Sequence, residues 1–181
     1  MKDSDDRLKI NDKVRNIVLK EIESRESEII DFLQDLIRIP SITGEEGKAQ
    51  GFIAKKFRSM DLEVDMFEAD VENLRGHPAF FETKSYTHCG YENRPNVIGQ
   101  LRGDDTAKSL MLSGHIDVVS PEPVLAWKHD PWGAEIEKGK LYGRGASDMK
   151  AGIAAMIYAL KSVQDTGIDL KGNVTLQTTI E

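Results

Sequence analysis

The chain has 181 residues, of which 39% are hydrophobic and 30% are charged, and this composition fits one folded domain of ordinary size rather than a disordered chain. Asp and Glu number 31 against 24 Lys and Arg, so the net charge of -7 makes nucleic acid an unfavourable partner. No run approaches the ~18 apolar residues that a membrane span requires.

The first part of the chain predicts two helical segments. Apolar residues recur at three- and four-residue steps over residues 9–38, with a break near residues 24–27. We therefore assign residues 1–38 to a leading helical segment. Thr43 is expected to cap a second helix that runs to about Met60, because a threonine side chain can accept from the free amide groups at a helix start.

The rest of the chain alternates between strands and a helix, with an excursion of no clear period over residues 70–95. The turn-rich residues 102–105 are expected to join two of the strands. Strands are predicted at 62–66, 96–101, 109–117 and 174–180, a hairpin at 135–142 around Gly139, and a helix from 149 to about 163. This alternation predicts a layered α/β sheet.

His115 and Asp117 are the first candidate functional residues. At the period of a strand they point to the same face, roughly 6.5 Å apart along the chain. They also lie at the carboxyl end of their strand, where open α/β sheets bind ligands. Imidazole can ligate a metal while a carboxylate orients it. The alternative is a histidine hydrogen-bonded in a turn.

Asp148 is the second candidate, in the glycine-rich stretch 142–152. It precedes the predicted helix, so it could cap that helix or ligate a metal. A dinucleotide-binding turn is excluded, because Asp148 stands where the third glycine of that motif belongs.

Together these stretches resemble a known family. Residues 113–119, 127–132 and 142–152 are similar to three motifs of the zinc aminoacylase and carboxypeptidase superfamily, which includes acetylornithine deacetylases and succinyl-diaminopimelate desuccinylases. The motifs occur in order, with 33 positions from His115 to Asp148, and residues 36–45 resemble the opening helix and loop of the family.

The resemblance implies a fold, a cofactor and residue roles. The fold is a three-layer αβα sheet of the zinc-dependent exopeptidase type. The cofactor is a pair of zinc ions, for which cobalt could substitute. His115 matches a ligand of one zinc, Asp117 the acid that orients its imidazole, and Asp148 the carboxylate that bridges both ions. A cis peptide is expected between Asp148 and Met149.

The general base of the family is the first glutamate of a pair that follows the last predicted strand. Aligned along that strand, Glu181 falls immediately before the pair, and a shifted alignment would make Glu181 the base itself. We expect the first alignment. Residues 1–181 then form the N-terminal portion of one metallohydrolase catalytic domain, without its lid or dimerisation domain, and the fold is incomplete.

The resemblance favours an amidohydrolase that removes an acyl group from an N-acyl amino acid-like substrate, as an acetylornithine deacetylase does. A dipeptidase or carboxypeptidase, or a deformylase acting on a heterocyclic amine, is the alternative within the family. The chain alone offers few zinc ligands, so we expect it to be inactive, and a non-catalytic binding module is the second hypothesis. The full-length protein could be a homodimer.

The remaining histidines and the cysteine carry less information. His77, His88 and Cys89 lie in the excursion at a spacing that fits no zinc template. His129, which lies between two tryptophans in the sequence, is expected to cap or pack rather than to ligate a metal. Cys89 is the one cysteine, so no internal disulfide can form. The charged N-terminus leads into no apolar segment of a secretory signal. We expect a cytoplasmic protein.

Overall fold

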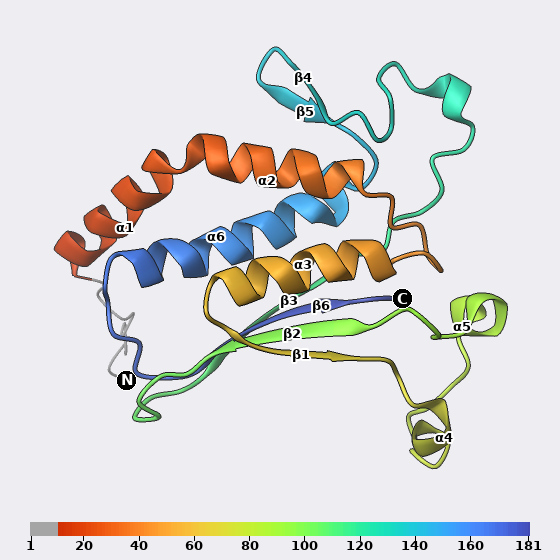
Figure 1. Ribbon diagram of the computed structural model, residues 1–181, viewed down its shortest axis with the longest axis horizontal. Helices are drawn as coiled ribbons and strands as arrows, with labels where there is room; N and C mark the ends of the chain where they lie inside the picture. Colours follow the sequence, from red (N-terminus) through yellow and green to blue (C-terminus); the bar gives the residue numbers. More distant parts are fainter. Residues whose placement is uncertain (1–10) are drawn as a thin grey trace, which may run out of the picture.

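The computed structural model describes residues 11–181, in which helices gather on one face of a sheet (Figure 1). The helices are α1 (Asp12–Ser24), α2 (Glu26–Arg38), α3 (Gly47–Ser59), α4 (Val71–Leu74), α5 (Lys84–Cys89) and α6 (Ala151–Asp165), with a 3-10 turn η1 (Val124–Ala126) and a π turn η2 (Ala146–Lys150). The strands are β1 (Glu63–Phe67), β2 (Asn96–Leu101), β3 (Leu110–His115), β4 (Glu135–Glu137), β5 (Lys140–Tyr142) and β6 (Val174–Thr179).

The main sheet has the strand order β1-β2-β6-β3. β2 is antiparallel to both of its neighbours, whereas β3 and β6 are parallel, with His115 opposite Thr179. The carboxyl ends of β3 and β6 therefore reach the same edge of the sheet. β4 and β5 form a separate hairpin.

The expected leading helical segment is two helices. The break falls at Arg25, within the interval that the sequence indicated, and the rest of the segment is helical from Asp12 to Arg38. Residues 1–10, which we also assigned to this segment, lie outside the described residues.

The prediction that Thr43 caps the next helix is wrong. α3 begins at Gly47 after Glu46, and the hydroxyl of Thr43 donates instead to Glu181 Oε2 at 3.3 Å. Gly44, between Thr43 and the start of α3, has φ +104°, a conformation that favours glycine. The chain therefore turns at Gly44 before the helix can start.

The core lies between the sheet and α2, α3 and α6. Leu36 of α2 and Ile53 and Phe57 of α3 are fully buried in this core. Ile153 and Ile157 of α6 are fully buried in it as well. The predicted helix near residues 149–163 is thus α6 with its expected apolar side inward. Gln50 of α3 reaches the sheet, where its amide donates to Thr178 O at 2.9 Å.

The turn predicted at residues 102–105 does not make a hairpin of β2 and β3, because β6 inserts between them. Val174 and Leu176 give β6 two buried apolar residues, which favours a central position in the sheet. Residues 102–109, which connect β2 to β3, lie beside the segment that precedes β6, where Thr106 N donates to Lys171 O at 3.1 Å. The predicted hairpin around Gly139 is confirmed by β4 and β5.

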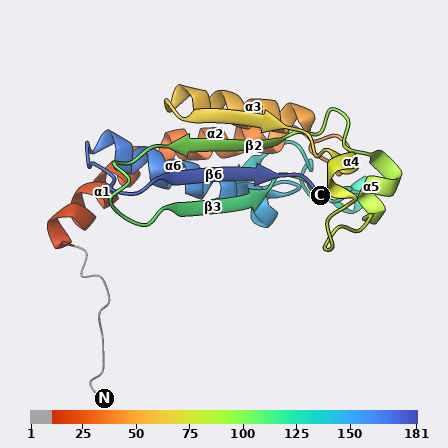
Figure 2. The ribbon, with the colours of Figure 1, turned by 90° about the horizontal axis from the view of Figure 1, so that it is seen from below.

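The other face of the sheet carries no helix of the described part of the chain (Figure 2). Its side chains are largely polar: Gln100 donates to Thr175 Oγ1 and Ser113 to Gln177 Oε1, each at 3.3 Å. Met111, on the edge strand β3, is 58% exposed. The α/β fold expected from the resemblance is therefore present with one helical layer, and it is incomplete among residues 11–181. Within the same residues, no helix is both long and apolar enough to cross a membrane.

Candidate functional site

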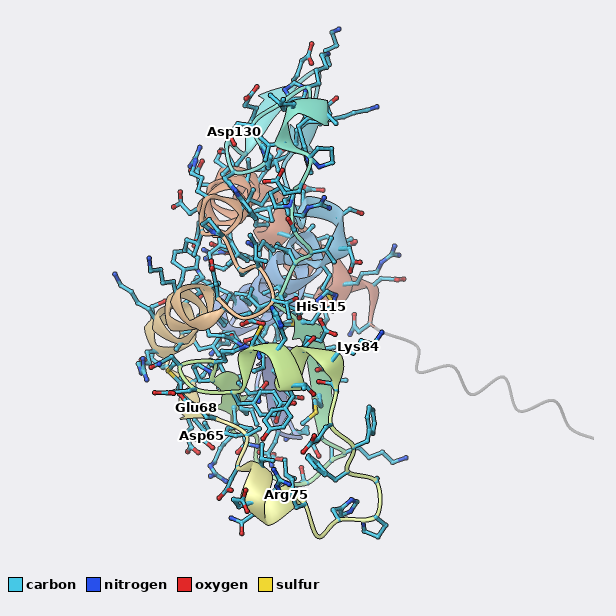
Figure 3. All side chains as sticks on the ribbon, turned by 90° about the vertical axis from the view of Figure 1, so that its right-hand side faces the viewer. Asp65, Glu68, Arg75, Lys84, His115 and Asp130 are labelled. Carbon is cyan, nitrogen blue, oxygen red and sulfur yellow. The ribbon has the colours of Figure 1, made fainter. Side chains whose placement is uncertain are left out.

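His115 ends β3 at the edge of the sheet that Figure 3 faces. Two backbone hydrogen bonds fix the chain that follows His115: Ile116 N donates to Thr179 O at 2.9 Å, and Val118 N donates to Ser41 O at 2.8 Å. Ile116 and Val118 are buried, so the alternate residues His115 and Asp117 face the pocket. This is the placement that the strand period predicted.

Asp148 reaches the same pocket from the turn after β5. Gly145 has φ +78°, and a Cβ there would lie 2.4 Å from Val118 Cγ1, so this turn requires glycine and packs directly on the strand extension. The expected cis peptide between Asp148 and Met149 is present. Asp148 does not cap α6, whose preceding residue is Lys150.

The three candidate side chains converge. His115 Nε2 lies 3.0 Å from Asp148 Oδ1, and His115 Nδ1 lies 3.3 Å from Asp117 Oδ1 and 3.1 Å from the backbone oxygen of Asp117. Asp117 is 13% exposed and Asp148 86% exposed. They line a pocket of about 230 Å³ together with Val119 and Arg144.

The charges of the pocket shift two pKa values. Burial alone would lower the pKa of His115, but the hydrogen bond with Asp148 and the charge of Asp117 outweigh it and raise that pKa. Burial raises the pKa of Asp117, and the nearby carboxylates of Glu181 and Glu46 add to the rise, against the opposing effect of His115. The pocket is therefore rich in negative charge and suited to a cation.

The donor set fits part of a zinc site. If Nδ1 of His115 carries the proton and donates to Asp117, then Nε2 presents a lone pair to a carboxylate oxygen of Asp148 at 3.0 Å. Two acceptors so close need a shared cation between them, either a proton or a metal ion. An imidazole nitrogen and a carboxylate oxygen are ordinary zinc ligands. Within residues 11–181, however, no group of three or more His, Cys, Asp and Glu side chains is placed so that all of them could hold one metal ion.

Lys150 anchors the turn that carries Asp148. Its ammonium is fully buried and donates to Leu36 O at 3.0 Å and Ile39 O at 2.8 Å, the carbonyls at the end of α2. Burial lowers the pKa of Lys150 to about 8. The cation is satisfied by backbone dipoles at a helix C-terminus, where positive charge is favoured.

A buried ion pair stabilises the far side of the same edge. Arg94 donates to both oxygens of Glu46, at 2.7 and 2.8 Å, and both residues are at most 1% exposed. Arg94 also donates to Glu181 O at 3.0 Å. The pair thus connects the excursion, the start of α3 and the end of β6.

Sequence reasoning missed Glu46, Arg94, Lys150 and Arg144. Lys150 belongs to the same motif as Asp148, so its place in the motif could have indicated a role at the site. Arg94 lies in the excursion, where no periodic pattern points to it.

The other histidines and Cys89 do not line the pocket. His129 packs as expected: its ring stacks on Tyr142 with centroids 4.0 Å apart, and Nδ1 lies 2.9 Å from Glu135 Oε2. Cys89 lies in α5 against the loop of Thr43, with Sγ 4.0 Å from its carbonyl oxygen. His77 and His88 are in the excursion, His77 accepting from Ala79 N at 3.2 Å.

The described residues thus form an α/β domain with a mixed sheet, and a histidine and carboxylates gather at the carboxyl ends of its parallel strands. Residues 111–181 match Peptidase family M20/M25/M40. An N-formyl-4-amino-5-aminomethyl-2-methylpyrimidine deformylase of Bacillus subtilis (strain 168) is 32% identical over 167 residues, which are 89% of this chain and 34% of that protein. A succinyl-diaminopimelate desuccinylase of Methylobacterium radiotolerans is 35% identical over 147 residues, 81% of this chain and 32% of that protein.

Solved structures agree on the fold. Human carnosine dipeptidase 1 superposes with a TM-score of 0.72 at 20% identity, over 91% of this chain and 34% of that one. The metallo-carboxypeptidase Sso-CP2 from Sulfolobus solfataricus superposes with a TM-score of 0.65 at 23% identity, over 85% of this chain and 31% of the carboxypeptidase chain. These matches support the superfamily of zinc aminoacylases and carboxypeptidases that the motifs indicated. The chain spans about a third of the length of the curated relatives it matches.

Proposed function

We propose that residues 1–181 form the N-terminal portion of the catalytic domain of a dinuclear zinc amidohydrolase, which removes an acyl group from an N-acyl amino acid-like substrate. The observation that carries the proposal is the 3.0 Å approach of His115 Nε2 to Asp148 Oδ1. The names of the relatives, a desuccinylase and a deformylase, support an enzyme that cleaves an acyl group from an amine.

In this proposal His115 would hold one zinc ion, and Asp148 would be the carboxylate shared by both ions. Zinc, or cobalt in its place, would supply a Lewis acid that polarises the amide carbonyl and activates water. With the His115 proton on Nδ1, where it would be donated to Asp117, Nε2 would be free to ligate. The fixed backbone on both sides of Asp117 keeps the imidazole in this orientation.

Glu181 lies beside the pocket, with its backbone oxygen bound by Arg94 and its carboxylate by Thr43. We retain both alignments for the general base: a glutamate that follows Glu181, which we favour, or Glu181 itself. In either case the end of β6 delivers the base to the edge where His115 lies.

The names of the desuccinylase and the deformylase point to different acyl groups on the substrate. A deformylase acting on a heterocyclic amine, or a dipeptidase or carboxypeptidase, is therefore the alternative within the same chemistry.

The test is zinc content and hydrolysis by a longer chain that covers the remaining length of the relatives. N-succinyl, N-acetyl and N-formyl amines and a set of dipeptides would be compared as substrates. The proposal predicts release of the free amine and its loss in His115→Ala. Full activity in that variant would overturn the assignment of His115.

The second candidate function is a non-catalytic binding module. The described residues bring together one histidine and one exposed carboxylate, whereas two zinc ions require several protein ligands. On this view the 181-residue chain binds zinc weakly and shows no turnover. Tight, stoichiometric zinc in the purified chain would contradict it. A cytoplasmic location, supported by the single cysteine, and a homodimer of the longer protein remain proposals.

A further inference from the structure

Two side chains hold the backbone just beyond the end of β6. The strand itself ends at Thr179. Ile180 N then donates to Asn96 Oδ1 at 3.1 Å, and the backbone oxygen of Glu181 accepts from Arg94 Nη2 at 3.0 Å. Residues 94–96, which lead into β2, therefore take over from the sheet ladder at this point.

The guanidinium of Arg94 binds three parts of the chain at once. Nε and Nη2 donate to the two carboxylate oxygens of Glu46, at 2.8 and 2.7 Å, and Nη1 donates to the backbone oxygen of Gly90. The bond to Glu181 O is additional. A planar fork with five N–H groups can serve a carboxylate and two carbonyls together. Arg94 thus joins the end of α5, the start of α3 and the end of β6.

The carboxylate of Glu46 is itself fixed. It is fully buried, and its Oε2 also accepts from Gly44 N at 3.1 Å. The start of α3 packs directly on the residue before Arg94, since a Cβ at Gly47 would lie 2.4 Å from Asn93 O. The ion pair therefore has little freedom to shift, and neither has the carbonyl that Arg94 holds.

Stabilisation of the fold alone does not require this pair to be charged. Burying two charges costs free energy that their attraction only partly offsets, and apolar residues of similar volume often stabilise a fold as well or better. Apolar side chains could fill the space of Arg94 and Glu46, but they could not donate to Glu181 O. The hold on the end of β6 is what the charged pair alone supplies.

The held backbone lies next to the candidate metal site. His115 is opposite Thr179 in the parallel ladder, two residues before Glu181, and Ile116 N donates to Thr179 O at 2.9 Å. The carboxylate of Glu181 accepts from the hydroxyl of Thr43 at 3.3 Å. A shift of the Glu181 backbone would therefore change its distance from the histidine.

We propose that Arg94 is a positioning residue for the general base of the hydrolase. By holding the backbone oxygen of Glu181, it fixes the end of β6 relative to His115. The inference rests on the proposed function, and it applies to both alignments of the base, because this oxygen belongs to the peptide group between Glu181 and the residue after it in a longer chain. Arg94 acts through that backbone and not by contact with metal or substrate.

The first measurement is amide hydrogen exchange in the metal-free longer chain that covers the remaining length of the relatives. Arg94→Met/Glu46→Leu removes both charges and leaves neither alone. We expect the amide of Ile180 to exchange at least about tenfold faster, because a charge-assisted hydrogen bond to the next residue is lost. The amide of Leu176, in the middle of β6, should exchange as in the parent. Unchanged exchange at Ile180 would overturn the proposal.

The second measurement is hydrolysis of N-acetyl, N-formyl and N-succinyl amines by the same chain loaded with zinc. We expect kcat of the double variant to fall by about 10–100-fold, because a displaced base slows the chemical step. KM and zinc content should stay as in the parent, since no substrate contact and no metal ligand is removed. A raised KM with unchanged kcat, or a loss of zinc, would contradict a positioning role.

Arg94→Lys distinguishes the planar fork from the charge. An ammonium still faces Glu46, but it lacks the planar fork that serves Glu46 and Glu181 together, so kcat should lie between those of the parent and the double variant. This variant also decides the question if the double variant does not fold. Parental exchange at Ile180 and parental kcat in Arg94→Lys would then overturn the proposal.

The chain offers a matched control pair. Arg102 also donates through two nitrogens to one carboxylate, that of Glu63, at 2.8 Å each, but both side chains are exposed. The pair lies at the opposite end of the sheet, where Leu101 is opposite Val174. Arg102→Gln/Glu63→Gln should leave both kcat and the exchange at Ile180 unchanged. Effects equal to those of the Arg94 variants would overturn the proposal.

The two measurements separate this inference from the proposed function. If the parent chain cleaves none of the amides, the proposed hydrolase is contradicted, and the exchange at Ile180 alone decides whether Arg94 positions the end of β6. If the parent is active and kcat is unchanged in both Arg94 variants, only the role of Arg94 is overturned.

Discussion

His115 Nε2 lies 3.0 Å from Asp148 Oδ1, although 33 positions of the chain separate the two residues. β3 supplies the histidine, and the turn after β5 supplies the carboxylate. The contact forms because Gly145 lets that turn pack on Val118, immediately beyond the strand.

Replacing His115 should weaken zinc binding by the chain. We expect His115→Ala to lower the affinity by more than about 100-fold, because it removes a ligand and not only its support. Isothermal titration with zinc measures this. His129→Ala is the matched control, since His129 is 11% exposed and pairs with Glu135 outside the pocket. Equal losses in the two variants would contradict the assignment.

Asp117→Asn should also weaken zinc binding, but by less than His115→Ala does. The amide still fills the space but carries no charge to orient the imidazole, and such outer partners are worth about 10–100-fold in metal affinity. The same titration applies. A loss larger than that of His115→Ala would instead make Asp117 a direct ligand.

Breaking the pair of Arg94 and Glu46 should destabilise the fold strongly. Arg94→Met leaves a buried carboxylate without its partner, and we expect a loss of about 3–5 kcal/mol in the free energy of unfolding. Urea unfolding measures it. The double variant Arg94→Met/Glu46→Leu should recover part of the loss, since neither charge is then left alone. Additive losses would show that the two residues act independently.

Gly145→Ala should cost more than Gly167→Ala. Both glycines have positive φ, +78° and +69°, so both variants incur a strain of about 1–2 kcal/mol. Only at Gly145 would the new Cβ also meet another atom, Val118 Cγ1, at 2.4 Å, whereas the space around Gly167 is open. The difference between their free energies of unfolding isolates this steric contact, and equal values would argue against it.

Acid should remove a stabilising contribution from Glu28. Burial alone would raise the pKa of Glu28, but hydrogen bonds with Lys56, Tyr158 and Arg25 lower it below its usual value. A carboxyl group with a lowered pKa stabilises the fold above its unfolded pKa, and the contribution is lost as the pH falls through the folded value.

Between pH 6 and pH 3, the free energy of unfolding of the unchanged chain should therefore fall further than that of Glu28→Gln. The difference should be at most about 1 kcal/mol, because the Glu28 carboxylate is partly exposed. Urea unfolding at both pH values measures this. Glu26→Gln, an exposed neighbour in the same helix, serves as the control. Equal pH dependence in the chain and Glu28→Gln would contradict the prediction.

Periodicity predicted the elements that form the core, and the motifs predicted the site. The strand period put His115 and Asp117 on one face because both flank the buried Ile116. The order of strands was not predictable from local patterns, since β6 enters between β2 and β3 from a segment about 60 residues further along the chain.

The cap at Thr43 failed for a related reason. Its hydroxyl binds Glu181, which is distant in sequence, and the helix start is held instead by Arg94 through Glu46. Arg94 lies in an excursion without a period, so only the folded chain shows what it contacts.

The most direct test of the metal centre is a crystal of the chain soaked in zinc, with anomalous diffraction recorded at the zinc edge. We predict an anomalous peak between His115 Nε2 and the carboxylate of Asp148. A peak confined to His129 and Glu135, or no peak at His115, would contradict the central claim.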